Sequence, residues 1–232
     1  MLTAVCFDLF STLADPGVAP EKEESDLIGI PHEKWSAAMW EDALCRDRGL
    51  GNITSLRGII DRACENLSIP VDEATRQALT IVREERFRKM LTLMAPGIVD
   101  TVRKLKEMDL KIGLVSNADV GDRLHWEDSP VRPYFSDSIW SCDVGLVKPD
   151  PAIYRLSLER LGVEPEEALF VGDGGSDELR GAKDVGLITV CTEAILRRAD
   201  PERSEIHRYA DYVISRFEEL VGIAEREMTD KG

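Results

Sequence analysis

The stretch that decides the fold is Met1–Leu13, MLTAVCFDLFSTL, in which a short apolar run ends at an acid. Ala4–Phe7 is uninterrupted by polar residues, and Asp8 follows it directly, before small hydroxyl residues. Apolar strands without alternation are typical of a parallel sheet that is covered on both faces. The run therefore predicts a buried strand that delivers a carboxylate to a loop. Two residues later, where a partner acid could stand, the chain has Phe10.

Composition and charge limit the classes of function. The chain has 232 residues and a formal net charge of −15, with 43% hydrophobic and 31% charged residues. This is an ordinary globular composition, and so acidic a surface repels nucleic acid and anionic membranes. No segment approaches the ~18 consecutive apolar residues of a membrane span, and the first segment lacks the basic residues of a signal peptide. The five cysteines are scattered without CxxC spacing, which predicts reduced thiols in a cytoplasmic protein.

Short apolar runs alternate with helical patterns along most of the chain. Apolar residues at helical spacing lie between the runs, for example at Ile98, Val102 and Leu105. Alternating strands and helices predict right-handed crossovers and a doubly wound, Rossmann-like α/β core around a parallel sheet. The predicted strands are Ala4–Phe7, Lys111–Val115, Ser138–Trp140, Ala168–Val171, Ile188–Val190 and Tyr212–Ile214.

Residues 15–93 follow a different pattern. Helical segments dominate this part, and no strand signal interrupts them. The simplest account is an all-helical domain at 15–93, inserted into an α/β core formed by 1–14 and 94–232. The tail after Phe217 is predicted to be a charged helix that frays. The helices predicted within the insert are Glu33–Arg48, Ser55–Leu67 and Asp72–Met94.

Polar side chains follow the strands at the points where the strands end. In an open parallel sheet, ligands bind beyond the carboxyl ends of the strands, so these side chains would meet at one edge. A lysine that precedes a proline-led helix start joins them. The residues that would converge are Asp8, Ser116, Asn117, Lys148, Asp173 and Asp177.

This set of side chains favours chemistry on an anion. A carboxylate and a phosphate dianion ~3.5 Å apart repel by roughly 9 kcal/mol at an effective dielectric of ~20, so a cation must offset the repulsion. Mg²⁺ commonly binds a few carboxylates together with phosphate oxygens, and Lys148 and Ser116 could hold the remaining oxygens. Each residue alone could equally be a turn or loop residue. Their order and spacing together favour a single site for chemistry on an anion, and with the resemblance described next the expected substrate is a small phosphorylated metabolite.

The same residues resemble the four motifs of the haloacid dehalogenase-like hydrolase superfamily. The first motif, Asp-x-Asp-x-Thr, reads Asp8-Leu9-Phe10-Ser11-Thr12, and the second is a Ser or Thr that ends the second core strand, here Ser116. The third is a lysine, matched by Lys148, and the fourth, Gly-Asp-x-x-x-Asp, runs from Gly172-Asp173 to Asp177. The resemblance covers the whole chain. It implies a doubly wound core with a helical cap between the first and second motifs.

By this resemblance, Asp8 is the nucleophile that forms an aspartyl-phosphate intermediate, which water then cleaves. Ser116 and Lys148 would hold the transferring phosphoryl group, with Asn117 beside them in the substrate site. The resemblance also implies that the cap closes over the site and selects the substrate. The implied Mg²⁺ ligands are Asp8, the backbone carbonyl of Phe10, Asp173, and Asp177 either directly or through another ligand.

Phe10 departs from the family pattern. The acid normally found there protonates the leaving group and then activates water, and its loss would cost about 10²–10⁴-fold in rate. A phosphatase with Phe10 would therefore act on phosphates whose leaving group departs easily, such as acyl or aryl phosphates, or would take a proton from elsewhere. Asp15 and His32 are candidates by proximity in sequence.

Three other hypotheses remain open. A 2-haloacid dehalogenase is favoured by the aromatic residue at position 10, because halide leaves without a proton, but Asp173 and Asp177 would repel a carboxylate substrate. A phosphonate hydrolase would need a cap lysine for a Schiff base, and the insert offers three lysines. A catalytically weak binding module is opposed by the presence of the other motif residues. The lysines of the insert are Lys22, Lys34 and Lys89.

Overall fold

Six short apolar runs form one parallel sheet in the computed structural model, which describes residues 1–18, 22–196 and 198–229. The strand order is β3-β2-β1-β4-β5-β6, so β1 lies in the interior of the sheet beside both β2 and β4. Every residue of β1 and of β4 is buried, as expected for strands with helices on both faces. The strands are β1 (Ala4–Phe7), β2 (Lys111–Ser116), β3 (Asp137–Trp140), β4 (Ala168–Gly172), β5 (Ile188–Thr192) and β6 (Tyr212–Ile214).

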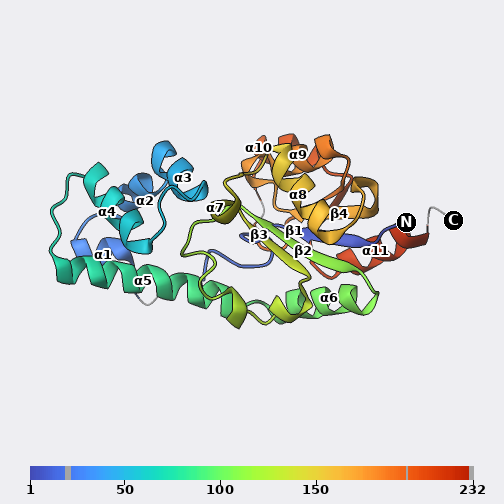
Figure 1. Ribbon diagram of the computed structural model, residues 1–232, viewed down its shortest axis with the longest axis horizontal. Helices are drawn as coiled ribbons and strands as arrows, with labels where there is room; N and C mark the ends of the chain where they lie inside the picture. The colour runs from blue at the N-terminus through green and yellow to red at the C-terminus, as the bar shows by residue number, and fades with distance from the viewer. Residues whose placement is uncertain (19–21, 197, 230–232) are drawn as a thin grey trace.

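Helices cover the two faces of the sheet and bury separate clusters of apolar side chains (Figure 1). On one face, α6 and α11 contribute Val102 and Leu220 to a cluster that includes Phe7. On the other face, α8 and α9 contribute Leu158 and Leu179. The doubly wound core predicted from the sequence is thus confirmed. The helices of the core are α6 (Pro96–Glu107), α7 (Ser141–Val144), α8 (Pro151–Leu161), α9 (Glu178–Val185), α10 (Glu202–His207) and α11 (Glu219–Thr229).

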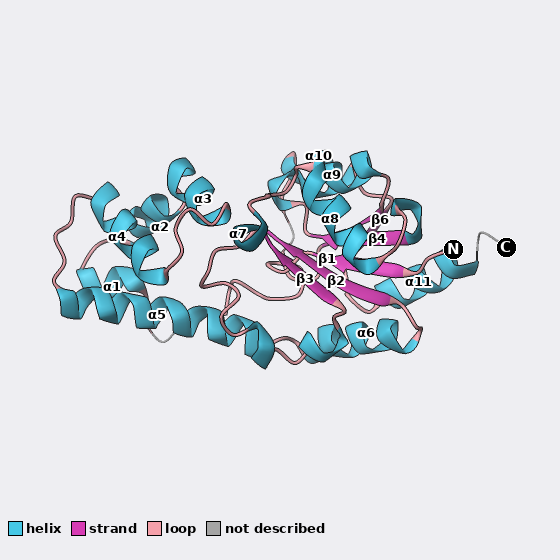
Figure 2. Ribbon diagram, in the orientation of Figure 1, coloured by secondary structure: helices cyan, strands magenta, loops and turns pink. Residues whose placement is uncertain are grey.

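Between β1 and α6 the described chain is helical, and it forms the left-hand part of the molecule in Figure 2. These helices enclose a third cluster, in which Trp35, Ile59 and Leu79 are buried. The long helix α5 runs from this part back to the core, where Leu91 joins the cluster under the sheet. The helices are α1 (Glu24–Ile28), α2 (His32–Met39), α3 (Asp42–Gly49), α4 (Leu56–Asn66) and α5 (Glu73–Thr92). Residues 19–21 of the predicted insert lie outside the described residues.

Local capping explains where the predicted helices of the insert begin. Ser55 caps α4 by accepting from the Gly58 amide at 3.1 Å. Asp72 caps α5 by accepting from the Thr75 amide at 2.8 Å. Each residue was predicted as the first residue of its helix and is instead the cap that satisfies free amides of the first turn.

Two details of the predicted helices were wrong. The segment predicted as one helix from Glu33 to Arg48 is two helices, because Glu41 turns out of the helix and accepts from the amides that begin α3. The short helix α1 was not predicted. The charged helix predicted after Phe217 is present as α11, which buries Leu220 and Ile223 against the core.

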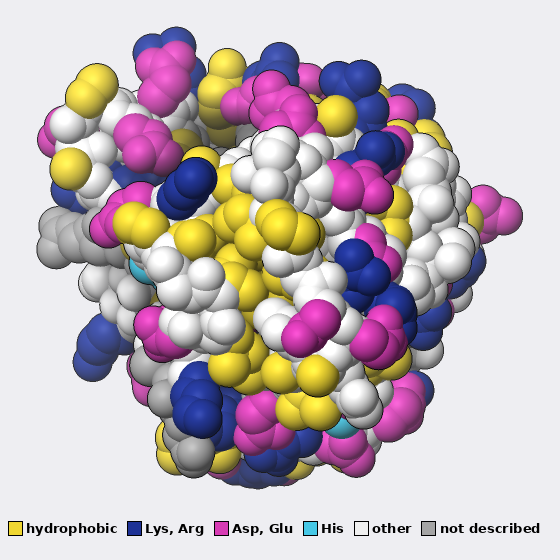
Figure 3. Space-filling view, turned by 90° about the vertical axis from the view of Figure 1, so that its left-hand side faces the viewer, with side chains coloured by type: hydrophobic (Ala, Val, Ile, Leu, Met, Phe, Trp, Pro, Cys, Tyr) yellow, Lys and Arg dark blue, Asp and Glu magenta, His cyan; other side chains and the backbone are white. Residues whose placement is uncertain are grey.

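The surface carries charges of both signs around apolar side chains. Figure 3 views the end of the molecule that holds the insert, where apolar side chains gather in the middle of the face and acidic and basic ones surround them. All five cysteines have free thiols. None of the helices in the described residues is both long and apolar enough to cross a lipid bilayer.

Candidate active site

The candidate site lies where the order of the strands reverses. The chain proceeds from β1 to β2 and β3 on one side, and then to β4 on the other side of β1. Asp8 follows β1 and Asp173 follows β4, so the two acids start from the carboxyl ends of neighbouring strands. Ligands of open α/β sheets bind at such reversal points. The topology therefore places both predicted acids where a ligand is expected.

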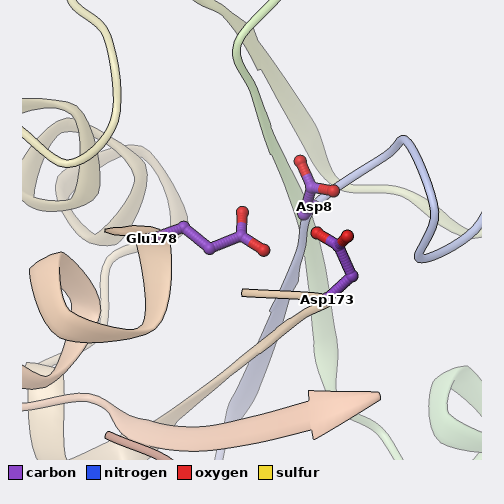
Figure 4. Close-up of side chains that lie close together, drawn as sticks. All are labelled: Asp8, Asp173 and Glu178. Atoms are coloured by element: carbon purple, nitrogen blue, oxygen red, sulfur yellow. The ribbon is translucent and has the colours of Figure 1, made fainter. Parts of the chain in front are cut away.

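Three buried carboxylates converge at this edge. Asp8, Asp173 and Glu178 each offer an oxygen, and these oxygens lie within 4.8 Å of one another. In Figure 4 the three side chains point toward a common centre, Asp8 and Asp173 from loops after strands and Glu178 from the start of α9. Such a group of acids stays ionised only if positive charge compensates it.

Lys148 supplies part of that charge. Its Nζ atom lies 2.5 Å from an Asp8 oxygen and 2.6 Å from a Glu178 oxygen, with all three side chains buried. The backbone of Lys148 is held by Asn117, whose side-chain oxygen accepts from the Lys148 amide at 2.7 Å and whose nitrogen donates to the Lys148 carbonyl at 3.0 Å. Asn117 therefore uses its side chain to position the lysine.

Burial and mutual repulsion set the pKa values of this group. Burial raises the pKa of Asp8 above its ordinary value, although Lys148 acts in the opposite direction. Burial, together with the negative charge of Asp8, raises the pKa of Glu178 to about 8. Burial disfavours the charge on Lys148, but Asp8 and Glu178 outweigh it and raise the pKa of the ammonium group well above its ordinary value. The lysine is thus a permanent cation, and the carboxylates are short of positive charge.

Two hydroxyl groups flank the acids differently. Thr12 donates to the second oxygen of Asp8 at 3.2 Å, which fixes the orientation of that carboxylate. Ser116 ends β2 and is fully buried, and its Oγ atom has no hydrogen-bond partner within the described part of the chain. A buried hydroxyl without a partner costs about 1–3 kcal/mol. The Ser116 hydroxyl is therefore available to a ligand oxygen.

Asp177 does not join the acids. It ends the short 3-10 helix Gly175–Asp177, and its exposed carboxylate lies 2.8 Å from an Arg180 nitrogen. Asp177 was expected to support the metal, but the next residue, Glu178, is the acid that joins Asp8 and Asp173, with its carboxylate beside Lys148. The sequence does contain a signal for this: Glu178 is four residues before Ala182, so it lies on the apolar face of α9, where a charged side chain must have a buried partner.

Phe10 occupies the position of the missing acid with a packed ring. It lies against the core cluster, and its ring centroid is 6.2 Å from that of Phe87 in α5. Neither candidate for a replacement acid is held near the three carboxylates by a described contact. Asp15 is exposed and accepts from the Gly17 amide at 2.7 Å, and His32 is about half exposed with its Nδ1 atom 3.8 Å from Glu23.

The insert is joined to the core by a buried ionic cluster that the sequence analysis did not identify. Asp119, in the loop after β2, receives Arg48 of α3 at 3.0 Å and Arg83 of α5 at 2.9 Å. Arg83 also lies 3.5 Å from Glu24 of α1. Burial and the neighbouring charge of Asp119 raise the pKa of Asp122 to about 7. These pairs fix three helices of the insert against the loop that follows Ser116.

Comparisons with known proteins show the family and the fold of the chain. A family model for haloacid dehalogenase-like hydrolases matches residues 2–186. A glyceraldehyde 3-phosphate phosphatase of Methanocaldococcus jannaschii is 31% identical over 138 residues, which are 58% of each chain, so the match spans little more than half of that relative. Among solved structures, a 2-haloacid dehalogenase from Pseudomonas syringae pv. Tomato DC3000 is similar with a TM-score of 0.67 and 25% identity, over 97% of this chain and 99% of that one. A HAD phosphatase from Thermococcus onnurineus has a TM-score of 0.65 and 24% identity, over 96% and 97% of the two chains.

Proposed function

Because the chain belongs to the haloacid dehalogenase-like hydrolases, we propose that it is a Mg²⁺-dependent phosphatase of a small phosphorylated metabolite. The observation that carries this proposal is the group of three buried carboxylates beside a buried, permanently charged lysine. An uncharged substrate would not need a buried group of carboxylates and a lysine at the point where the order of the strands reverses. The relatives named as phosphatases support the same class of reaction.

Asp8 is the nucleophile in the proposed reaction. Thr12 and Lys148 each bind one oxygen of its carboxylate and so hold it in one orientation. Attack of a carboxylate oxygen on phosphorus breaks the bond to the leaving-group oxygen and forms an aspartyl phosphate, which water then cleaves to inorganic phosphate and Asp8. Lys148 and the free hydroxyl of Ser116 would bind the non-bridging oxygens of the phosphoryl group, and Asn117 keeps Lys148 in place.

The donor set fits Mg²⁺, which prefers oxygen ligands and commonly binds few protein carboxylates. Asp8 and Asp173 would hold the ion together with the backbone carbonyl of Phe10. Glu178 would hold it directly or orient the other ligands from its place beside Lys148. The ion would supply positive charge that offsets the repulsion between Asp8 and a phosphate dianion.

Phe10 limits the substrates of this reaction. A phenyl ring cannot donate a proton to the leaving group, so phosphates with good leaving groups, such as acyl or aryl phosphates, are the expected substrates. We further propose that residues 15–93 act as the cap that selects the substrate, over a core formed by 1–14 and 94–232. The ionic cluster around Asp119 would hold this cap against the loop after Ser116.

Phosphate release from an aryl phosphate, measured with Mg²⁺ and with EDTA, tests the proposal. We expect a rate that depends on Mg²⁺ and is lost in Asp8→Asn. A rate that EDTA does not change, or that survives Asp8→Asn, would refute the mechanism. Asp100→Asn serves as a control, because Asp100 is an exposed acid of α6 that pairs with Arg103.

The second candidate function is a 2-haloacid dehalogenase, which the aromatic side chain at position 10 favours. Halide leaves without a proton, so this reaction would not need the missing acid. Asp173 and Glu178 oppose it, because their negative charges would face a carboxylate substrate. Halide release from a 2-chloro acid in EDTA would favour the dehalogenase, and absence of both activities with Mg²⁺ binding intact would favour a binding module.

A further inference from the structure

Asp173 is paired with an arginine that the proposed reaction does not use. Arg198, in the segment after β5, donates from Nη2 to the Asp173 carboxylate at 2.7 Å and from Nη1 to the Asp173 backbone carbonyl at 2.5 Å. Its Nε atom lies 2.8 Å from Glu202 at the start of α10, and its side chain is 16% exposed. The guanidinium is thus fixed on both sides and is largely withdrawn from solvent.

The surrounding loop is built around this pair. The other oxygen of Asp173 accepts from the Gly175 amide at 3.1 Å. Gly174 has a φ of +87°, and a Cβ atom there would come within 2.3 Å of Ile206 in α10. Helix α10, which begins four residues after Arg198, therefore packs directly on the loop that carries Asp173.

The charges at the site show what Arg198 adds. Lys148 is shared by Asp8 and Glu178, whereas Arg198 faces Asp173. Three carboxylates thus face two cations, so the ionised group keeps one uncompensated negative charge without a metal. A divalent cation that binds Asp173 must either share that carboxylate with the guanidinium and be repelled by it, or displace it.

We propose that Arg198 is a built-in counter-cation that competes with the divalent metal for Asp173 and thereby sets the affinity of the site for Mg²⁺. The inference rests on the proposed function, since it assumes that Asp173 is a metal ligand. It adds a role for a residue of the chain outside the four motifs. In the metal-free protein Arg198 stabilises Asp173, and in the metal-bound protein its charge opposes the ion.

If Arg198 had only a structural role, its removal would change the Mg²⁺ affinity in the opposite direction. If the arginine only orients Asp173 for coordination, its removal would weaken Mg²⁺ binding. If it competes, its removal would strengthen binding. The direction of the change in the dissociation constant therefore decides between the two.

Isothermal titration of the metal-free protein with MgCl₂ measures this directly. Arg198→Gln and Arg198→Met remove the charge, and we expect each to lower the Kd for Mg²⁺ at least 10-fold. Arg198→Lys keeps the charge, and its Kd should stay within about 3-fold of wild type, since the repulsion between cation and ion is retained. Arg180→Gln is the matched control, because Arg180 pairs with the exposed Asp177 and should leave the Kd unchanged.

Thermal unfolding gives a readout that is independent of activity. In EDTA, Arg198→Gln should melt below wild type, because Asp173 has lost its counter-charge. In saturating MgCl₂ the difference in Tm between the variant and wild type should become smaller or change sign, because a ligand that binds the folded state more tightly stabilises it more. Circular dichroism verifies that each variant is folded before titration.

Equal or weaker Mg²⁺ binding by the two neutral variants would overturn the inference while leaving the proposed phosphatase intact. Failure of the wild-type protein and of both neutral variants to bind Mg²⁺ would overturn the metal-dependent function as well. The two failures are therefore distinguishable in one set of titrations.

Discussion

Asp119 is the residue at which a single substitution should most weaken the attachment of the insert to the core. Its carboxylate is buried and accepts from Arg48 at 3.0 Å and from Arg83 at 2.9 Å. Asp119→Asn keeps the size of the side chain and can keep the hydrogen bond from the Gly121 amide, which donates to the other oxygen at 2.8 Å. The substitution removes the negative charge between two buried arginines, and the amide nitrogen that then faces them cannot accept their hydrogen bonds.

The expected cost follows from that arrangement. Breaking a buried ion pair by removing one partner costs about 3–5 kcal/mol, because the remaining charge is left uncompensated. Arg83 retains Glu24 at 3.5 Å, which favours the lower end of this range. A loss of about 3 kcal/mol corresponds to a decrease in Tm of roughly 6–12 °C for a chain of this length.

Urea unfolding at pH 7.5 measures the loss in the free energy of unfolding. Glu73→Gln is the matched control: it also removes an acid from an arginine, Arg57, but that pair is exposed and screened by water, so its loss should be much smaller than that of Asp119→Asn. A loss below about 1 kcal/mol in Asp119→Asn would refute the reasoning that the insert is held by this buried cluster.

Four further substitutions test the site and its surroundings. The raised pKa of Asp122, about 7 against an ordinary 3.8, means that ionisation destabilises the fold progressively between those two values; Asp122→Asn should therefore be more stable than wild type at pH 8, by up to about 4 kcal/mol, with the gain vanishing near pH 4 in urea titrations. Glu178→Gln should weaken Mg²⁺ binding by about 10–100-fold in titration calorimetry, whereas Asp177→Asn should change it less than about 2-fold; the reverse order would contradict the placement of Glu178. Ser116→Ala should abolish most aryl phosphatase activity while raising stability by about 1 kcal/mol, since it removes a buried hydroxyl without a partner; a loss of stability would count against a ligand-binding role. Phe10→Asp should raise the ratio of alkyl to aryl phosphate hydrolysis at least about 10-fold, and an unchanged ratio would show that position 10 does not face the leaving group.

The sheet was predictable because its strands are buried on both faces. Ala4–Phe7 and Ala168–Val171 are short apolar runs that end at an acid or at a glycine, and both are fully buried in the structure. Chain order then places the acids, because a crossover topology brings the carboxyl ends of neighbouring strands together. The convergence of Asp8 and Asp173 follows from these local signals alone.

To predict that Glu178 lies in the site, one must know which residues of α9 face the core, and the sequence motif alone does not give this. Spacing from Asp173 selected Asp177, but backbone geometry decides which acid turns inward. Asp177 has a φ of 54° just before α9 begins, and its side chain lies outside with Arg180. Glu178 is the first residue of the helix and shares its apolar face. A motif counted in residues cannot detect this one-position shift, whereas helical periodicity can.

The cluster around Asp119 could not be predicted from the sequence, because its members are distant along the chain. Arg48 and Arg83 lie 71 and 36 residues from Asp119. Each has the local appearance of a solvated charge on an amphipathic helix. Only the packing of α3 and α5 against the loop after β2 buries them, and that packing depends on the tertiary fold.

Phe10 belongs to the same junction. Its ring lies against Phe87, and the guanidinium of Arg83 lies 4.9 Å from the centroid of the Phe87 ring. A continuous set of contacts therefore leads from the position of the missing acid to the buried cluster that holds the insert. Replacement of an acid by Phe10 adds apolar packing between insert and core at a point where an unpaired carboxylate would weaken it. For the proposed phosphatase, Phe10 therefore has two effects. It packs the insert more closely against the core, and it leaves the leaving group without a proton donor at position 10.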